Sequence, residues 1–225
     1  MRLNYIDNID CLEGLKAIPD KSVDLIVTDP PYTSPVKNAY GRDVIHRLSD
    51  LSLQEFYFNE LRKEFERVLT PNGRLCIFCD TAYFAVLFGT FYHWKNKASL
   101  VWDKGRIGMG NPIRLRHELI FYAGIDSFTP NKDTHTHLPS VIQCPPEKGF
   151  HPAQKPLKLV EQLVSCLSFP GDVVLDPFMG SGTTAVACLR TSRNYIGFEL
   201  SPEYHAIAQQ RIADTLDEML EEVEA

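Results

Sequence analysis

The sequence lacks any long apolar run. No segment of its 225 residues reaches the about 18 apolar residues that a membrane helix needs. The first ten residues, Met1–Asp10, have neither the basic start nor the apolar stretch of a signal peptide. We therefore expect a soluble, cytoplasmic protein with no membrane partner.

The sequence also lacks the residue pattern of a metal site. Its six cysteines are scattered, and the one close pair, Cys76 and Cys79, has no second pair to complete a zinc site. Residues three apart on a strand face opposite sides of the sheet, which separates these two thiols further. His135 and His137 have no matching acid or cysteine pattern, so we expect surface histidines, buried reduced thiols and no bound metal.

An overall basic charge is missing as well, because the net charge is -6. A protein coated in cations for holding nucleic acid is therefore excluded. Cations nevertheless dominate between His93 and His117, whereas the chain from Asp214 onward carries only acids. This asymmetry predicts a local basic face, and two ordinary solvated surfaces are the alternative.

Apolar runs alternate with segments of helical period, which is typical of an α/β protein with a parallel sheet. One helix is expected in the segment that ends at Pro71–Gly73, and another should begin at Ser201-Pro202-Glu203. Two stretches break the alternation, namely the polar loop Thr33–Ser49 and the aperiodic insertion Gly124–Gly149. The expected strands are Val23–Thr28, Arg74–Cys79, Ser99–Trp102, Leu119–Tyr122, Val173–Asp176 and Tyr195–Glu199.

A glycine-rich turn follows the strand that ends at Asp176, in "DPFMGSGTT". Gly180 and Gly182 permit a tight turn and a close approach of a ligand to the start of a helix. The sequence has no GxGxxG here and no lysine after the glycines, so a P-loop is excluded. Glu199, at the tip of the next strand, is suited to the hydroxyls of a ribose. Asp176 would repel a pyrophosphate but attract an amino group, so the turn favours S-adenosylmethionine over a dinucleotide. The alternative is a plain strand-to-helix turn.

A second strand ends in Asp29-Pro30-Pro31-Tyr32. Ligands of open α/β sheets bind at the carboxyl ends of strands, and this is such an end. Proline has no amide hydrogen and stiffens the residue before it, so the segment presents acceptors and few donors. Its natural partner is a planar ring with an exocyclic amine, stacked on Tyr32. An incidental proline turn is the alternative interpretation.

These motifs resemble those of the amino-group DNA methyltransferases, and the resemblance covers nearly the whole chain. "DPPY" at 29–32 is similar to their catalytic motif, "DPFMGSGTT" at 176–184 to their cofactor loop, and "HPAQKP" at 151–156 to the segment before that loop. The order of the motifs is that of the β class. The resemblance implies a Rossmann-like sheet of the S-adenosylmethionine-dependent methyltransferases, with helices on both faces and a small inserted recognition region. It divides a single domain, 1–225, into a catalytic half (1–123), a recognition insertion (about 124–149) and a cofactor-binding half (150–225).

The resemblance also implies roles for individual residues. The expected catalytic residues are Asp29, Pro30, Pro31 and Tyr32, with Asp29 and the Pro30 carbonyl as acceptors for the target amine. Ala153 departs from the family, where many relatives have threonine or serine and so a hydroxyl contact that is missing here. The residues expected at the cofactor are Asp10, Cys11, His151, Lys155, Asp176, Pro177, Phe178, Gly180, Ser181, Gly182, Thr183, Glu199 and Leu200. Those expected on DNA phosphates are Lys104, Arg106, Arg114 and Arg116, together with the loop Thr33–Arg47.

The expected function is transfer of a methyl group from S-adenosylmethionine to adenine N6 in double-stranded DNA, after the base has been flipped out of the duplex. A first-position aspartate more often accompanies adenine in this family, and a serine more often accompanies cytosine. Three alternatives remain open: cytosine N4 methylation, methylation of a side-chain amide in protein, and an inactive DNA-binding module. The sequence leaves the oligomeric state open, with a homodimer as one option.

Overall fold

The computed structural model describes residues 1–31, 51–108, 112–126, 137–147, 149 and 154–224, with the backbone alone for 51–56, 223 and 224. The predicted loop Thr33–Ser49 lies outside these residues. Within them, no helix combines the length and the apolar character needed to cross a membrane. All six cysteines are buried and free, as predicted.

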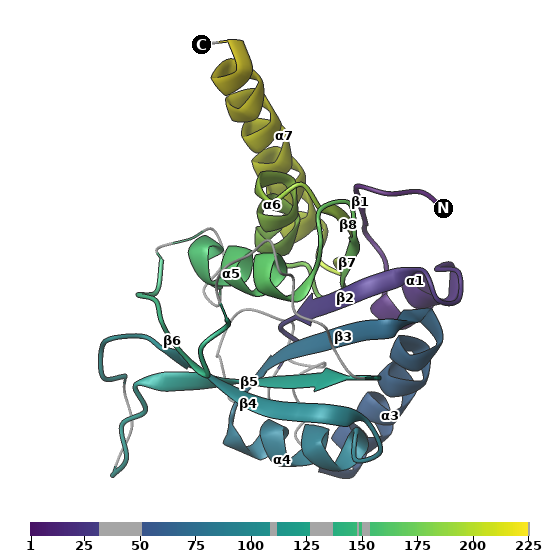
Figure 1. Cartoon of the computed structure of the whole chain (residues 1–225), viewed down its shortest axis with the longest axis vertical. Coiled ribbons are helices and arrows are strands. Elements are labelled where there is room, and N and C mark those ends of the chain that lie inside the picture. The colour runs from purple at the N-terminus through teal and green to yellow at the C-terminus, as the bar shows by residue number, and fades with distance from the viewer. Residues whose placement is uncertain (32–50, 109–111, 127–136, 148, 150–153, 225) are drawn as a thin grey trace.

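A central sheet of eight strands organises the described residues (Figure 1), in the order β1-β8-β7-β2-β3-β5-β4-β6. The strands are β1 (Tyr5–Asp7), β2 (Val23–Thr28), β3 (Leu69–Cys79), β4 (Lys95–Asp103), β5 (His117–Gly124), β6 (Val141–Gln143), β7 (Val173–Asp176) and β8 (Asn194–Phe198). All six predicted strands are confirmed. β1 and β6 were not predicted, and β6 lies inside the insertion expected to be aperiodic.

The prediction of a parallel sheet is wrong in one strand. β5 pairs antiparallel with both of its neighbours, β3 and β4, while the other pairings are parallel. The physical reason lies in the connections. Parallel neighbours need a crossover, usually a helix, whereas the described chain between β4 and β5 contains no helix and turns back on itself through the bonds from Lys104 N to the Arg116 carbonyl and from Gly108 N to the Leu115 carbonyl. The sheet is therefore mixed.

Helices cover both faces of the sheet, as predicted (Figure 1). One face carries α1 (Cys11–Lys16), α3 (Leu51–Val68) and α4 (Thr81–Thr90), and the other carries α5 (Leu157–Leu167), α6 (Thr183–Arg190) and α7 (Pro202–Glu224). Each set of helices packs its apolar side chains into its own core, such as Phe65 on one face and Leu163 on the other, both fully buried. The sheet thus separates two cores and leaves its strand ends accessible.

The predicted helix before Pro71–Gly73 is α3, but it ends at Val68. The next residue, Leu69, already pairs with Val23 of β2, and the register then shifts until Leu25 faces Arg74. Pro71–Gly73 therefore form an irregularity near the start of a strand and do not stop the helix directly.

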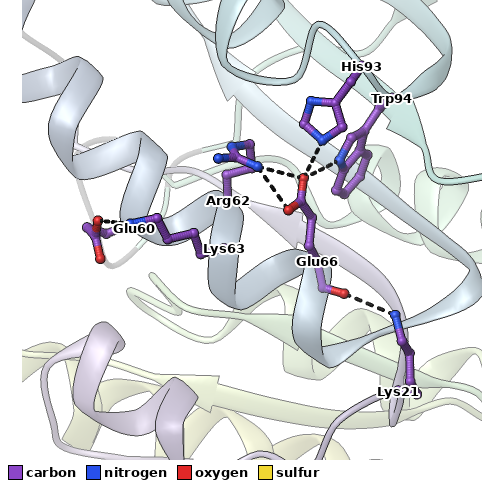
Figure 2. A network of polar contacts seen from close by, with 7 residues as sticks. All are labelled: Lys21, Glu60, Arg62, Lys63, Glu66, His93 and Trp94. Carbon is purple, nitrogen blue, oxygen red and sulfur yellow. Dashed lines mark hydrogen bonds and ion pairs between the residues drawn. The ribbon is translucent and has the colours of Figure 1, made fainter.

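A carboxylate network fastens α3 to the turn between α4 and β4 (Figure 2). Glu66 accepts hydrogen bonds from Arg62 Nη1 at 2.9 Å and from the indole of Trp94 at 2.9 Å, and it lies 2.6 Å from His93 Nε2. Burial raises the pKa of Glu66, but these partners outweigh burial and hold it below its usual value. Lys21, two residues before β2, donates to the Glu66 carbonyl, so the network lies at the amino ends of the strands.

Candidate active site

The carboxyl ends of β2 and β7 meet at a small cavity. These strands are parallel neighbours, and Thr28 Oγ1 at the end of β2 donates to Asp176 Oδ1 at the end of β7 over 2.7 Å. The enclosed space has a volume of about 50 Å³. The predicted site residues that line it are Asp29, Lys155, Asp176, Phe178, Gly180, Ser181 and Thr183. Two motifs far apart in the sequence therefore form one site.

Asp29, the acid of the proline segment, takes part in a chain of charges. Its Oδ2 is 2.5 Å from Lys155 Nζ, and the same ammonium lies 3.4 Å from Glu118 Oε2, an ion pair without hydrogen-bond geometry. Lys104 closes the chain, with its Nζ 2.5 Å from Glu118 Oε1. Four charged groups of alternating sign thus connect the tip of β2 with β5 and the chain after β4.

This charge chain keeps Lys155 ionised although only 8% of its side chain is exposed. Burial alone would lower the pKa of Lys155, but Asp29 and Glu118 outweigh burial and raise it. Burial likewise raises the pKa of Glu118, and Lys155 and Lys104 more than reverse that effect. The ammonium also lies 5.1 Å from the centre of the Phe78 ring, a favourable cation–π distance.

The two prolines after Asp29 are held in place. Pro30 is buried, and the Pro31 carbonyl accepts a hydrogen bond from Tyr83 Oη at 3.1 Å. Tyr83 lies on α4, whose first turn is capped by Asp80. Tyr32, predicted to stack on the target base, lies outside the described residues. The hydrogen bond from Tyr83 thus anchors the backbone two residues after Asp29 to α4.

Asp176 is committed to the turn that follows it. Its Oδ1 accepts from Thr28 and from the amide of Phe178 at 3.0 Å, and its Oδ2 accepts from Thr184 Oγ1 at 2.6 Å. Burial raises the pKa of Asp176 to about 6, and these hydrogen bonds only partly offset that rise. Pro177, the next residue, is also buried. The Asp176 carboxylate therefore stabilises the glycine turn by binding Phe178 before the glycines and Thr184 after them.

The glycines of the turn have the conformations that the sequence predicts. Gly180 and Gly182 adopt φ values of 54° and 84°, in the left-handed region that favours glycine. A Cβ on Gly182 would lie 3.0 Å from that of Ala208. Among the residues that the structure describes, a Cβ on Gly180 would have no neighbour nearer than the Phe178 carbonyl at 4.0 Å, so these residues leave the face at Gly180 open to a ligand.

Glu199 supports the same turn from the tip of β8. Its two carboxylate oxygens accept from the amides of Gly180 at 2.8 Å and Ser201 at 2.7 Å. Burial raises its pKa, and these amides act in the opposite direction. Asn8 donates to the carbonyls of Glu199 and Leu200. The side chain of Leu200 is 60% exposed. The chain after β1 is thereby fixed beside the end of β8.

The predicted adenine end of the site begins at Asp10. Asp10 caps α1 by accepting from the amides of Leu12 and Glu13. The buried thiol of Cys11 is 3.1 Å from Tyr57 Oη, and burial raises the pKa of that thiol to about 12. The Tyr57 ring in turn lies 6.4 Å from that of Phe178, between ring centres. Tyr57 therefore lies between Cys11, at the start of α1, and Phe178, in the glycine turn.

The predicted phosphate-binding cations differ in their surroundings. Arg116 forms a two-pronged ion pair with Asp103 at 2.6 Å, and Lys104 is held by Glu118. Arg106 and Arg114 are exposed. Of the other predicted residues, His151 and Ala153 lie outside the described part of the chain, and so does His135, whereas His137 is exposed. Among the residues that the structure describes, none form a cluster suited to a metal ion.

Sequence reasoning missed several residues of the site. Thr28 and Thr184 stand next to predicted residues, and a hydroxyl at the end of β2 and another in the first turn of α6 were usable signals. The sequence around Tyr57 and Tyr83 is typical of core positions on helices and gave no sign of a role at the site. Glu118 gave only one signal, an acid at the start of an apolar strand, and its partner is 37 positions away, since 155 − 118 = 37. Contacts of this range follow from the fold alone.

The residues present fit the cationic amino-acid end of S-adenosylmethionine. Carboxylates from Asp29 and Asp176, the ammonium of Lys155 and the open face at Gly180 border one cavity. These groups complement a sulfonium, a carboxylate and an amine. A cavity of about 50 Å³ encloses one end of such a molecule, since pockets for whole ligands measure roughly 300–1,000 Å³.

Comparison with known proteins agrees with this geometry. The N6/N4 model described as DNA methylase matches residues 23–210. The chain is 31% identical to the type II methyltransferase M.HhaII of Haemophilus parahaemolyticus, over 88% of this chain and 92% of that protein. It is 27% identical to the type II methyltransferase M.HpaI of Haemophilus parainfluenzae, over 94% and 76%.

Solved structures lead to the same family. The complex of M1.HpyAVI with S-adenosylmethionine superposes with a TM-score of 0.69 at 27% identity, covering 92% of this chain and 98% of that one. The cytosine-N4-specific PvuII DNA methyltransferase superposes at 0.73 with 22% identity, over 96% and 92%, and supports the fold. The cofactor is S-adenosylmethionine. The chain belongs to the S-adenosylmethionine-dependent N6/N4 amino-methyltransferases of DNA.

Proposed function

We propose that the protein transfers the methyl group of S-adenosylmethionine to N6 of adenine in double-stranded DNA. The observation that carries this proposal is the position of Asp29, at the carboxyl end of β2 on the wall of the cofactor cavity. The choice of adenine rests on the Asp-Pro-Pro-Tyr sequence at 29–32, since this form of the motif more often accompanies adenine in the family.

The proposed role of Asp29 is to accept hydrogen from the target amine. The lone pair of an aromatic amine is delocalised into its ring, which makes the amine a poor nucleophile. Two acceptors, the Asp29 carboxylate and the Pro30 carbonyl, would hold both hydrogens and localise the pair on nitrogen. Lys155 stabilises the negative charge of Asp29, and Tyr83 fixes the backbone after it. Positioning and electrostatics supply the catalysis.

Bound S-adenosylmethionine supplies an electrophilic methyl group on its sulfonium. Held by the two acceptors, the amine nitrogen would be aimed at this methyl, and the carbon–sulfur bond would break as the carbon–nitrogen bond forms. The Asp29 carboxylate would then accept one proton of the methylated amine, which would leave a neutral product. No covalent intermediate with the protein is needed.

The remaining predicted residues complete the proposal. Phe178, Gly180, Ser181, Gly182 and Thr183 would enclose the methionine part, with Asp176 holding the turn. Glu199 would hold the ribose, and Asp10 and Cys11 would lie at the adenine end. Tyr32 would stack on the flipped base, and residues 124–149 would contribute to recognition of the sequence.

Labelled S-adenosylmethionine and unmodified DNA test the proposal. We expect label on adenine with the wild-type protein. Asp29→Ala should lower the transfer rate by about 100-fold or more while leaving cofactor binding within about threefold. Asp217→Asn, an exposed acid on α7, is the matched control and should keep full activity.

Each alternative has its own outcome in this assay. Label on cytosine would reassign the target to N4, and label on protein would indicate side-chain amide methylation. Cofactor binding without transfer to any acceptor would indicate an inactive DNA-binding module. Full activity of Asp29→Ala would contradict the catalytic assignment.

A further inference from the structure

The described residues between β4 and β5, 104–108 and 112–116, form a two-sided extension of the hairpin, here called the β4–β5 arm. Its two sides are joined by backbone hydrogen bonds, from Lys104 N to the Arg116 carbonyl at 3.0 Å and from Gly108 N to the Leu115 carbonyl at 2.8 Å. The hairpin thus continues past the last paired residues of the sheet, Asp103 and His117. Figure 1 shows the chain extending beyond the sheet at this end of β4 and β5.

The arm exposes aliphatic side chains. Ile107, Ile113 and Leu115 are 59%, 75% and 50% exposed. Three large aliphatic side chains exposed along so short a segment make the arm a candidate surface for contact with another molecule. Ile113 is the most exposed of the three.

The charge of the arm indicates which molecule. Residues 104–116 contain Lys104, Arg106, Arg114 and Arg116 and no acid, in a chain whose net charge is -6. Lys104 and Arg116 are held at the base by Glu118 and Asp103. Closer to the tip, Arg114 Nε donates to the Gly108 carbonyl. Arg106 has no hydrogen bond or ion pair within the described part of the chain. In DNA, charged phosphates lie beside stacked apolar bases. Cations on the arm can bind the phosphates, and its aliphatic side chains can contact the bases.

The arm lies on the catalytic side of the sheet. β4 runs in the same direction as β2, so the arm leaves the same edge at which Asp29 lies. Three strand spacings separate β2 from β4, which places the base of the arm about 14 Å from the strand that carries Asp29. The charge chain from Lys104 through Glu118 and Lys155 to Asp29 fixes the base of the arm relative to the site.

We propose that the β4–β5 arm is a wedge that enters the DNA base stack beside the target base. Ile113 occupies the space next to the flipped base, Ile107 supports it, and Arg106 and Arg114 bind the flanking phosphates. Aliphatic side chains act in this way in architectural DNA-binding proteins, where they separate neighbouring bases and bend the duplex. This inference rests on the proposed function, because a paired base must leave the duplex to reach Asp29.

The test compares two duplexes that carry the target sequence, which is first read from DNA methylated by the wild-type protein. In one duplex the target base is paired, and in the other it faces an abasic position, so that it leaves the stack without help. We expect Ile113→Ala to slow single-turnover methylation of the paired duplex by about tenfold and that of the abasic duplex by less than about twofold. Ile113→Leu should act as wild type on both.

Matched variants separate a wedge from other roles. Leu220→Ala removes another exposed aliphatic side chain, 63% exposed on α7, and should change neither rate. Arg106→Ala should weaken binding of both duplexes equally and reduce the dependence of binding on salt by about one counterion. Cofactor binding by each variant shows that it is folded.

Two results would overturn the wedge: equal rates for Ile113→Ala and wild type on the paired duplex, or an equal loss on both duplexes. A third is a change from dimer to monomer in Ile113→Ala during sedimentation, which would identify the patch as a contact with a second copy of the chain. Failure of the proposed function gives a different result, because the wild-type protein would then methylate neither duplex, and the wedge would be rejected with it.

Discussion

Two carboxylates, one at the carboxyl ends and one at the amino ends of the parallel strands, each bind several cationic or hydrogen-donating groups. Their networks have different roles. Glu118 holds Lys104 and Lys155 at the carboxyl edge. Glu66 holds Arg62, His93 and Trp94 at the amino edge (Figure 2). The six residues of β2 separate the two edges by about 20 Å.

The difference lies in what each network connects. Glu66 fastens a helix to a nearby turn, and all its side-chain partners belong to those two segments. Glu118 connects the β4–β5 arm to Lys155, and through it to Asp29. A carboxylate that joins structural segments affects stability, whereas one that ends at a reacting group should affect chemistry. Matched substitutions in the two networks test this distinction.

The largest effect is expected from Lys155→Met. The substitution leaves Asp29 and Glu118 without their shared ammonium, which should destabilise the fold by about 2 to 4 kcal/mol, because part of each carboxylate still reaches water. Methyl transfer should fall by about 100-fold or more. Denaturant unfolding and single-turnover rates measure the two effects. An active and fully stable variant would contradict the importance of the charge chain.

Glu118→Gln should reduce activity more than stability. Through its single amide oxygen, glutamine can still accept the hydrogen bond from Lys104, but it lacks the charge that helps to hold the pKa of Lys155 high. We expect a loss of about tenfold in kcat. Without this neighbouring charge the pKa of Lys155 falls, so activity should also be lost at a lower pH on the alkaline side. The pH profile of kcat measures the shift.

The same substitution in the second network, Glu66→Gln, is the control for Glu118→Gln. It should leave kcat and its pH profile unchanged, and an equal effect of both variants would remove the distinction drawn here. We expect Glu66→Gln to lower the free energy of unfolding by about 1 to 2 kcal/mol, because Arg62 and Trp94 lose a charged acceptor. Glu60→Gln, which breaks an exposed pair with Lys63 on the same helix, should cost less than about 0.5 kcal/mol.

The smallest effect is the dependence of the Glu66 contribution on pH. The pKa of Glu66 is lowered in the folded protein, so the folded state binds its proton less tightly than the unfolded state does. Its contribution is complete above the unfolded pKa, about 4.3, and is lost as the pH falls through the lower folded value. The stability difference between wild type and Glu66→Gln should therefore shrink below about pH 4. Urea unfolding at several pH values measures it.

Local patterns allowed the central strands and the glycine turn to be predicted. β7 is buried along its length and β2 is buried except at Asp24, so both read as apolar runs, and their ends are marked by Asp29 and Asp176. Glycine at positive φ is required by the turn itself, and the conformations of Gly180 and Gly182 follow. Such features depend on residues close together in the sequence.

Features set by tertiary pairing could not be predicted in the same way. β1 and β6 have three residues each, too few to show a period. The reversal of β5 had one signal, since the segment 104–116 has no helical pattern and a short connection favours antiparallel strands. The sharing of Lys155 between Asp29 and Glu118 had none, because motif comparison considers each residue separately. The role of Lys155 at the cofactor stays a prediction.

The pairing of β2 with β7 has a consequence for synthesis of the chain. Thr28 and Asp176 are 148 positions apart, so one edge of β2 has no strand to pair with until β7 has left the ribosome. At roughly 5–20 residues per second this interval is on the order of 7 to 30 s. During that time an apolar strand of the future core is exposed to other nascent chains, and a protein that binds such edges would protect it. No partial product that stops before residue 173 can assemble the site.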